Sequence, residues 1–90
     1  MTVEIVIPAF LQPFTGGAAL ADVDGKTLGQ CLDELVGQFP RLQEKIYVED
    51  YILHKGINVF VNSQRADPKE LTRLVADGDK IHIAYVTVGG

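Results

Sequence analysis

One segment of this 90-residue chain has the spacing of a long amphipathic helix, and the segments around it have the spacing of strands. Apolar residues recur at helical intervals, which predicts a helix at about 28–38 that ends before Pro40. These residues are Leu28, Cys31, Leu32, Leu35 and Phe39. Thr27 and Gln30 match a capping box, in which the threonine hydroxyl accepts from a free N–H and the glutamine reaches back. A single main helix is typical of a domain in which the helix packs on a sheet.

Segments rich in β-branched residues or alternating in polarity predict four strands, at 2–7, 18–23, 57–62 and about 80–86. The first two would form a hairpin across a loop and turn expected from Phe10 to Gly17. Asp77-Gly78-Asp79 predicts a turn before the last strand.

The remaining segments are less regular. Residues 41–45 predict a helical turn, and residues 51–53 predict a short strand. Asp67 and Pro68 suit the cap and the first position of a short helix.

The predicted order is strand, strand, helix, strand, short helix, strand. It indicates an α+β domain of two layers, a mixed sheet with one main helix packed on one face. A compact result requires the first and last strands to be parallel neighbours. The length predicts one domain spanning residues 1–90, with a flexible C-terminal tail at about 87–90.

Composition narrows the class of partner. The net charge of −4 argues against nucleic acid, which attracts a basic surface, and favours a more basic protein partner. No segment approaches the ~20 apolar residues of a membrane helix, and no signal peptide is evident, so no membrane partner is expected. The single cysteine gives no internal disulfide and fits a cytoplasmic location.

The chain ends in Gly89-Gly90, directly after the strand predicted at 80–86. Residues without a Cβ let a backbone pass through a narrow channel, so this tail suits entry into a partner enzyme. The terminal carboxylate is ionised at neutral pH and reacts only after activation, most simply as an acyl-adenylate made from ATP. The alternative is an ordinary frayed terminus.

Three segments together resemble the MoaD/ThiS family of ubiquitin-like sulfur carriers, which have the β-grasp fold. They are Ile57-Asn58-Val59-Phe60-Val61-Asn62, Val75-Ala76-Asp77-Gly78-Asp79-Lys80-Ile81 and Gly89-Gly90. The family shows an N-V-x-V-N-type strand, an L-x-D-G-D-x-I turn and a terminal Gly-Gly. The resemblance extends over essentially the whole chain.

The resemblance implies that an E1-like enzyme adenylates the Gly90 carboxylate and that a sulfur donor converts it to a thiocarboxylate. The sulfur then passes to a synthase subunit for molybdopterin, thiamin or cysteine synthesis. The chain itself would bind no cofactor and would be a cosubstrate rather than an enzyme, with ATP used by the partner. Its length favours the molybdopterin or cysteine type over the thiamin type, and the molybdopterin type is our expectation. The family pattern often has a small or proline-containing stretch where this chain has Val86-Thr87-Val88.

A partner-binding surface follows from strand alternation. If Ile81 and Ile83 face the core with Tyr85, then His82, Ala84 and Val86 face away from it. Phe60 would also face outward, and an exposed apolar patch is typical of an interaction site. We expect the activating enzyme to dock on this surface and to contact Thr87 and Val88 in the tail. The alternative is that Phe60 is ordinary core, covered by the segment 41–55.

The cysteine, the histidines and the paired aspartates give little indication of a catalytic or metal-binding site. Cys31 lies on the apolar face of the helix, so a buried structural role is expected. His54 and His82 lack the spacing of metal ligands, and no metal site is expected. Asp77 and Asp79 suit a turn better than a catalytic carboxylate pair. Two other functions stay open: a modifier that is conjugated to lysines, and a β-grasp subunit that only binds.

Overall fold

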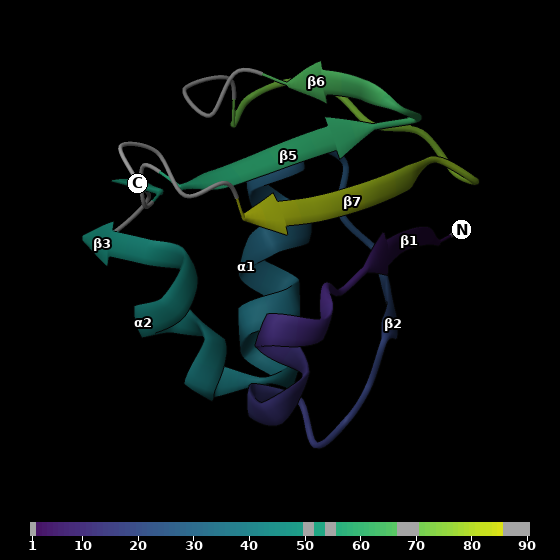
Figure 1. Ribbon diagram of the computed structural model, residues 1–90. Helices are drawn as coiled ribbons and strands as arrows, with labels where there is room; N and C mark the ends of the chain where they lie inside the picture. Colours follow the sequence, from purple (N-terminus) through teal and green to yellow (C-terminus); the bar gives the residue numbers. More distant parts are fainter. Residues whose placement is uncertain (1, 50–51, 54–55, 67–70, 86–90) are drawn as a thin grey trace.

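The computed structural model describes residues 2–49, 52–53, 56–66 and 71–85. A five-stranded sheet forms one layer, and the helix α1 (Leu28–Gln38) lies across one face of it (Figure 1). The strands of this sheet are β1 (Val3–Val6), β2 (Leu20–Val23), β5 (Ile57–Val61), β6 (Gln64–Ala66) and β7 (Lys80–Tyr85). A separate two-stranded sheet pairs β3 (Tyr47–Glu49) with β4 (Ile52–Leu53).

The strand order in the main sheet is β2-β1-β7-β5-β6. β1 and β2 form the expected antiparallel hairpin, and β1 runs parallel to β7 with Val6 opposite His82. The prediction that the first and last strands are parallel neighbours is therefore confirmed. β7 is the central strand of this sheet.

The helix α1 has the predicted bounds, and its start is held by three kinds of bond. Thr27 Oγ1 accepts from the Gln30 N–H at 3.1 Å, as a capping residue does. The Gln30 side chain accepts from the N–H of Lys26 at 2.9 Å, one residue earlier than a standard capping box would place it. The N–H groups of Leu28 and Gly29 donate to carbonyls of the segment before β7, at 2.8 Å each. The first turn of α1 thus depends on residues that are distant in sequence.

The core lies between α1 and the inner face of the sheet. The buried side chains alternate along the strands and recur at helical spacing along α1, as predicted. Cys31 is fully buried there, which confirms its expected structural position. Burial raises the pKa of the Cys31 thiol, so the group stays neutral and unreactive.

The segment from Phe10 to Gly17 is only partly the loop that the sequence predicts. Residues Ala9–Phe14 form a 3₁₀ helix, η1, whose Leu11 is buried in the core. The buried Thr15 hydroxyl donates to the carbonyls of Gln12 and Ala18, which fixes the chain where η1 ends. The predicted turn follows it, with positive φ at Gly16 and Gly17. β2 accordingly starts at Leu20 rather than at residue 18.

The least regular region contains more structure than predicted. Helical residues at 40–46 comprise η2 (Pro40–Leu42) and α2 (Gln43–Ile46), which agrees with the expected turn at 41–45. β3 and β6 were not predicted. Tyr51, which was placed in a short strand, lies outside the described residues. The same holds for Asp67 and Pro68 at the predicted short helix.

Asn62 ends β5 in a turn rather than continuing the strand. Asn62 and Ser63 have φ angles of 51° and 69°, and they form the two-residue connection between β5 and β6. Positive φ at both central residues is the geometry of a type I′ hairpin turn, in which asparagine is favoured. The strand predicted at 57–62 is therefore one residue too long.

Candidate functional site

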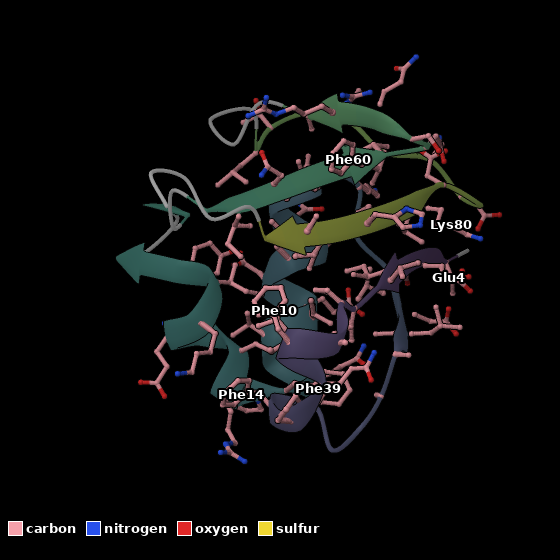
Figure 2. The ribbon with its side chains drawn as sticks, in the orientation of Figure 1. Glu4, Phe10, Phe14, Phe39, Phe60 and Lys80 are labelled. Carbon is pink, nitrogen blue, oxygen red and sulfur yellow. The ribbon has the colours of Figure 1, made fainter. Side chains whose placement is uncertain are left out.

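The outer face of the sheet, opposite α1, displays three of the predicted partner-binding residues together. Phe60 lies directly opposite His82 in the pairing of β5 with β7, and Ala84 lies one step further along β7, opposite Asn58. All three are partly exposed, whereas Val59, Val61, Ile81 and Ile83 on the alternate positions are buried. Phe60 is not part of the buried core, and Figure 2 shows it on β5. The structure therefore does not favour the alternative that Phe60 is ordinary core.

Two residues that the sequence reasoning missed extend this surface to the edge of the sheet. Val6 lies opposite His82, and Leu20 lies opposite Val6. Leu20 is 55% exposed, which is unusual for a large apolar side chain on a strand. A single row thus crosses five strands; we call it the outer-face row, and it consists of Leu20, Val6, His82, Phe60 and Arg65. The signal for Leu20 was present in the alternation of β2, where Ala21 and Val23 are buried and Leu20 and Asp22 are exposed.

A charged row lies next to the outer-face row, on the side away from the tail. Glu4 is opposite Asp22 in β2 and opposite Lys80 in β7. The Lys80 ammonium is 3.4 Å from Glu4 Oε1, and Figure 2 shows the two side chains at the start of β7. The apolar surface is therefore bounded by charge at the start of β7 and continues through Ala84 toward its end.

The start of β7 is held by a network of hydrogen bonds from distant segments. Asn62 Nδ2 donates to Asp79 Oδ1, and the Lys80 N–H donates to Asn62 Oδ1, both at 2.9 Å. The Ala76 N–H donates to Asp79 Oδ2 at 2.8 Å, which closes the turn around Gly78. These donors stabilise the carboxylate form and lower the pKa of Asp79, the Ala76 N–H most strongly.

The first residues of the chain join the same network. The Thr2 N–H donates to Asp77 Oδ1 at 2.6 Å, and the Gly78 N–H donates to the Thr2 carbonyl at 2.9 Å. Gly78 has φ of +87°, which explains why glycine stands between the two aspartates. The interpretation of Asp77 and Asp79 as turn residues is confirmed.

The tail itself cannot be placed in this way. β7 ends at Tyr85, and the predicted site residues Val86, Thr87, Val88, Gly89 and Gly90 lie outside the described residues. Because β1 is parallel to β7, β7 ends at the end of the sheet at which β1 leads into η1. The roles of these five residues stay predictions.

The described residues contain neither a group of side chains arranged to hold a metal ion nor a helix able to span a membrane. Within them no group of three or more His, Cys, Asp or Glu side chains is arranged to hold a metal ion. His54 is outside the described residues, and His82 lies between Val6 and Phe60 rather than beside another ligand. Among the described helices, none is long and apolar enough to span a membrane.

Comparison with known proteins gives consistent matches over the whole chain. Residues 5–90 match the model of the ThiS family. The sulfur carrier protein CysO of Mycobacterium tuberculosis is 30% identical over 100% of both chains. The crystal structure of SAMP1 from Haloferax volcanii superposes with a TM-score of 0.85 at 30% identity, covering 100% of both chains.

A third match is to a complex. The structure of the BexX/CysO complex from Amycolatopsis orientalis contains a chain that superposes with a TM-score of 0.85 at 29% identity, covering 98% of this chain and 99% of that one. These neighbours and the observed topology confirm the ubiquitin-like β-grasp fold. They also show that a protein of this kind is found bound to a partner protein.

Proposed function

We propose, because the chain belongs to the ThiS family, that it is a sulfur carrier whose Gly90 carboxylate is adenylated by an E1-like enzyme and then converted to a thiocarboxylate. Similar proteins include a sulfur carrier protein and a small archaeal modifier protein. The observation that supports the proposal best is the arrangement along β7: an anchored start, an apolar outer surface in the middle, and the tail after its end.

The chemistry requires two substitutions, the first at the α-phosphorus of ATP and the second at the carbonyl carbon of Gly90. A Gly90 carboxylate oxygen attacks the α-phosphorus of ATP, and pyrophosphate leaves. A sulfide equivalent then attacks the acyl carbon, and AMP leaves with its bonding electron pair, which gives the thiocarboxylate. The partner supplies ATP and the acid–base groups, while this chain supplies the carboxylate and the surface by which it is held.

The outer-face row is the proposed docking surface for the activating enzyme. Leu20, Val6 and Phe60 offer apolar contact across several strands, and burial of such residues is the main source of interface affinity. Val86, Thr87 and Val88 would extend the contact into the enzyme, and Gly89 and Gly90 would pass the narrowest part of its channel.

A synthase subunit that accepts the sulfur is the second proposed partner. It must bind the same tail, so it and the activating enzyme take turns. The expectation of a molybdopterin-type acceptor rests on the length of the chain and stays a prediction. A cytoplasmic location is proposed on the same basis as before, the single buried cysteine.

Mass spectrometry tests the proposal directly. The purified chain is incubated with a candidate E1-like enzyme, ATP and a sulfide donor, and the tryptic peptide 81–90 is examined at high resolution. Replacement of one oxygen by sulfur in that peptide, absent from a Gly90 deletion, is the expected result. Oxidation gives a similar mass, but its usual targets Met1 and Cys31 lie outside the peptide. No adenylate and no sulfur with any such enzyme would contradict the proposal.

The similarity to an archaeal modifier protein supports a second candidate function. A modifier would form an isopeptide bond between Gly90 and a lysine of another protein. Cells that express a tagged chain would then contain higher-mass adducts, and these would disappear when the target lysines are replaced. Adducts without any thiocarboxylate would favour the modifier over the carrier.

A further inference from the structure

The backbone of the edge strand β2 directs hydrogen-bonding groups away from the sheet. β2 lies at one end of the strand order, beside β1. The Ile7 N–H donates to the Ala19 carbonyl at 2.8 Å, which fixes the phase of this antiparallel ladder. In such a ladder, alternate residues bond to the residue opposite, and the residues between them point their N–H and C=O groups the other way. The backbone groups of Leu20 and Asp22 therefore point to the free edge of the sheet.

Two side chains of α1 reach this free edge. Gln38 Nε2 donates to the Asp22 carbonyl at 2.8 Å. Glu34 Oε2 accepts from the Asp24 N–H at 2.9 Å. Glu34 and Gln38 are one helical turn apart, so they lie on the same face of α1; we call the pair the edge clamp. The edge clamp occupies one acceptor and one donor that an added strand would otherwise use.

Without the edge clamp, the edge of β2 is complementary to a second copy of itself. Antiparallel pairing about a two-fold axis at Ala21 would set Leu20 of each copy opposite Asp22 of the other. In that register the Leu20 N–H would donate to the Asp22 carbonyl of the second copy, and the Leu20 carbonyl would accept in return. The two Asp22 carboxylates would not face each other directly, and part of the Leu20 side chain, which is 55% exposed, would be covered. The Asp22 carbonyl that this pairing needs is the one that Gln38 holds.

We propose that the edge clamp is an autoinhibitory contact, which keeps β2 from pairing with the β2 strand of a second copy of this chain. An exposed apolar side chain on an edge strand otherwise favours edge-to-edge association. β2 has only four residues, so an added strand gains few hydrogen bonds, and loss of one acceptor on each copy removes a large share of them. The closed edge keeps the chain monomeric. It also leaves Leu20 uncovered, as the docking surface proposed above requires.

Sedimentation velocity over a wide range of concentration tests the proposal on the purified chain alone. The test variant, Glu34→Ala/Gln38→Ala, removes the edge clamp and leaves a strong helix former at both positions of α1. Its dissociation constant for self-association is expected to be at least about tenfold lower than that of wild type, because each copy regains a free acceptor and a free donor. The control variant, Asp33→Ala/Gln43→Ala, loses the same charge and one amide from exposed positions outside the edge clamp. Its self-association is expected to change less than about twofold.

Two further substitutions, made in the background of the test variant, show whether the association uses the edge of β2. Asp22→Pro removes the outward N–H and spares the ladder to β1, since proline is tolerated on an edge strand where the N–H faces solvent. Leu20→Lys leaves the backbone intact and places a charge on the exposed side of the edge. Both are expected to return self-association to the wild-type level, with circular dichroism showing the native fold.

Three results would overturn the inference. They are a test variant that associates as weakly as wild type, equal association of test and control variants, and association that survives both further substitutions. Because no enzyme is present, each of these results is independent of whether Gly90 is adenylated, so failure of the closed edge and failure of the proposed function are distinguishable.

Discussion

The two ends of β7 differ in how they are held. At its start, the Asp79 carboxylate, the Asn62 amide and the Thr2 backbone join three distant segments by hydrogen bonds. Toward its end, Ala84 on the outer face is partly exposed and lies opposite Asn58, and the tail follows. Residues that stabilise the fold and residues available to a partner therefore lie at opposite ends of one strand. Substitutions at the start should change folding, and substitutions at the end should change transfer.

The largest effect is expected from deletion of Gly90. The deletion should abolish thiocarboxylate formation, because the next carboxylate is set back by one residue from the reacting position. The midpoint of urea unfolding should not change, since the last buried core residue that the structure describes is Ile83. Mass spectrometry and circular dichroism measure the two outcomes. Sulfur transfer by the shortened chain would show that Gly90 is not the reacting residue.

A charge introduced into the outer-face row should weaken partner binding and leave folding largely unchanged. Phe60→Asp and Leu20→Asp are each expected to weaken binding to the activating enzyme by about tenfold or more, because a carboxylate would be buried unpaired at the interface. The effect of Leu20→Asp on folding should be small, since this side chain is 55% exposed. Calorimetric titration gives the dissociation constants. Unchanged binding of both variants would place the docking surface elsewhere.

Two glycines allow a matched comparison of substitutions. Gly25 lies in the loop before α1, and Gly37 lies near the end of α1. A Cβ on Gly25 would lie 2.7 Å from the Cys31 nitrogen and 2.8 Å from its sulfur, whereas a Cβ on Gly37 would meet no atom within 4 Å. Gly25→Ala should therefore lower the free energy of unfolding by about 1–3 kcal/mol. Gly37→Ala should raise it by about 0.5–1 kcal/mol, because alanine favours a helix more than glycine does. Urea denaturation of both variants is the measurement, and equal effects would contradict the predicted close packing.

The smallest effect is expected from the hydrogen bonds of Asp79. Its folded-state pKa is lowered, so its contribution is present above the unfolded value of about 4 and is lost as pH falls through the folded value. Asn62→Ala removes one of the donors and should raise this pKa toward its ordinary range. We expect the lost hydrogen bond to Asp79 to account for at most about 1 kcal/mol at pH 7, since Asp79 is close to solvent and screened, in addition to a pH-independent cost of alanine at the positive φ of residue 62.

The measurement for Asn62→Ala is the free energy of unfolding at pH 7 and near pH 3. The difference between variant and wild type should shrink as the pH falls, because protonation of Asp79 removes the negative charge that the Asn62 amide stabilises. Binding to the activating enzyme should stay at the wild-type level. A loss of transfer without a loss of stability would remove the proposed separation of the two ends.

Much of the fold was predictable because its signals are local. The apolar stripe from Leu28 to Leu35 gave the exact helix, and alternation gave the inner and outer faces of β5 and β7. The candidate site was predictable to the same extent, since Phe60, His82 and Ala84 lie on one face as expected. Alternation within β1 and β2 indicates that Val6 and Leu20 face outward, but their alignment with His82 and Phe60 depends on the register between strands, which the pattern of one strand does not contain.

The sequence by itself determined the helix, the alternating strands, the Asp77-Gly78-Asp79 turn and the terminal glycines. These depend on the periodicity of side chains and on the backbone preferences of single residues. Only the tertiary structure decided that η1 is helical, that Asn62 turns and binds Asp79, and that Arg41 and Lys45 share the ring of Phe14. Each of these depends on contacts between residues far apart in the chain, whose free energy exists only once the layers have packed.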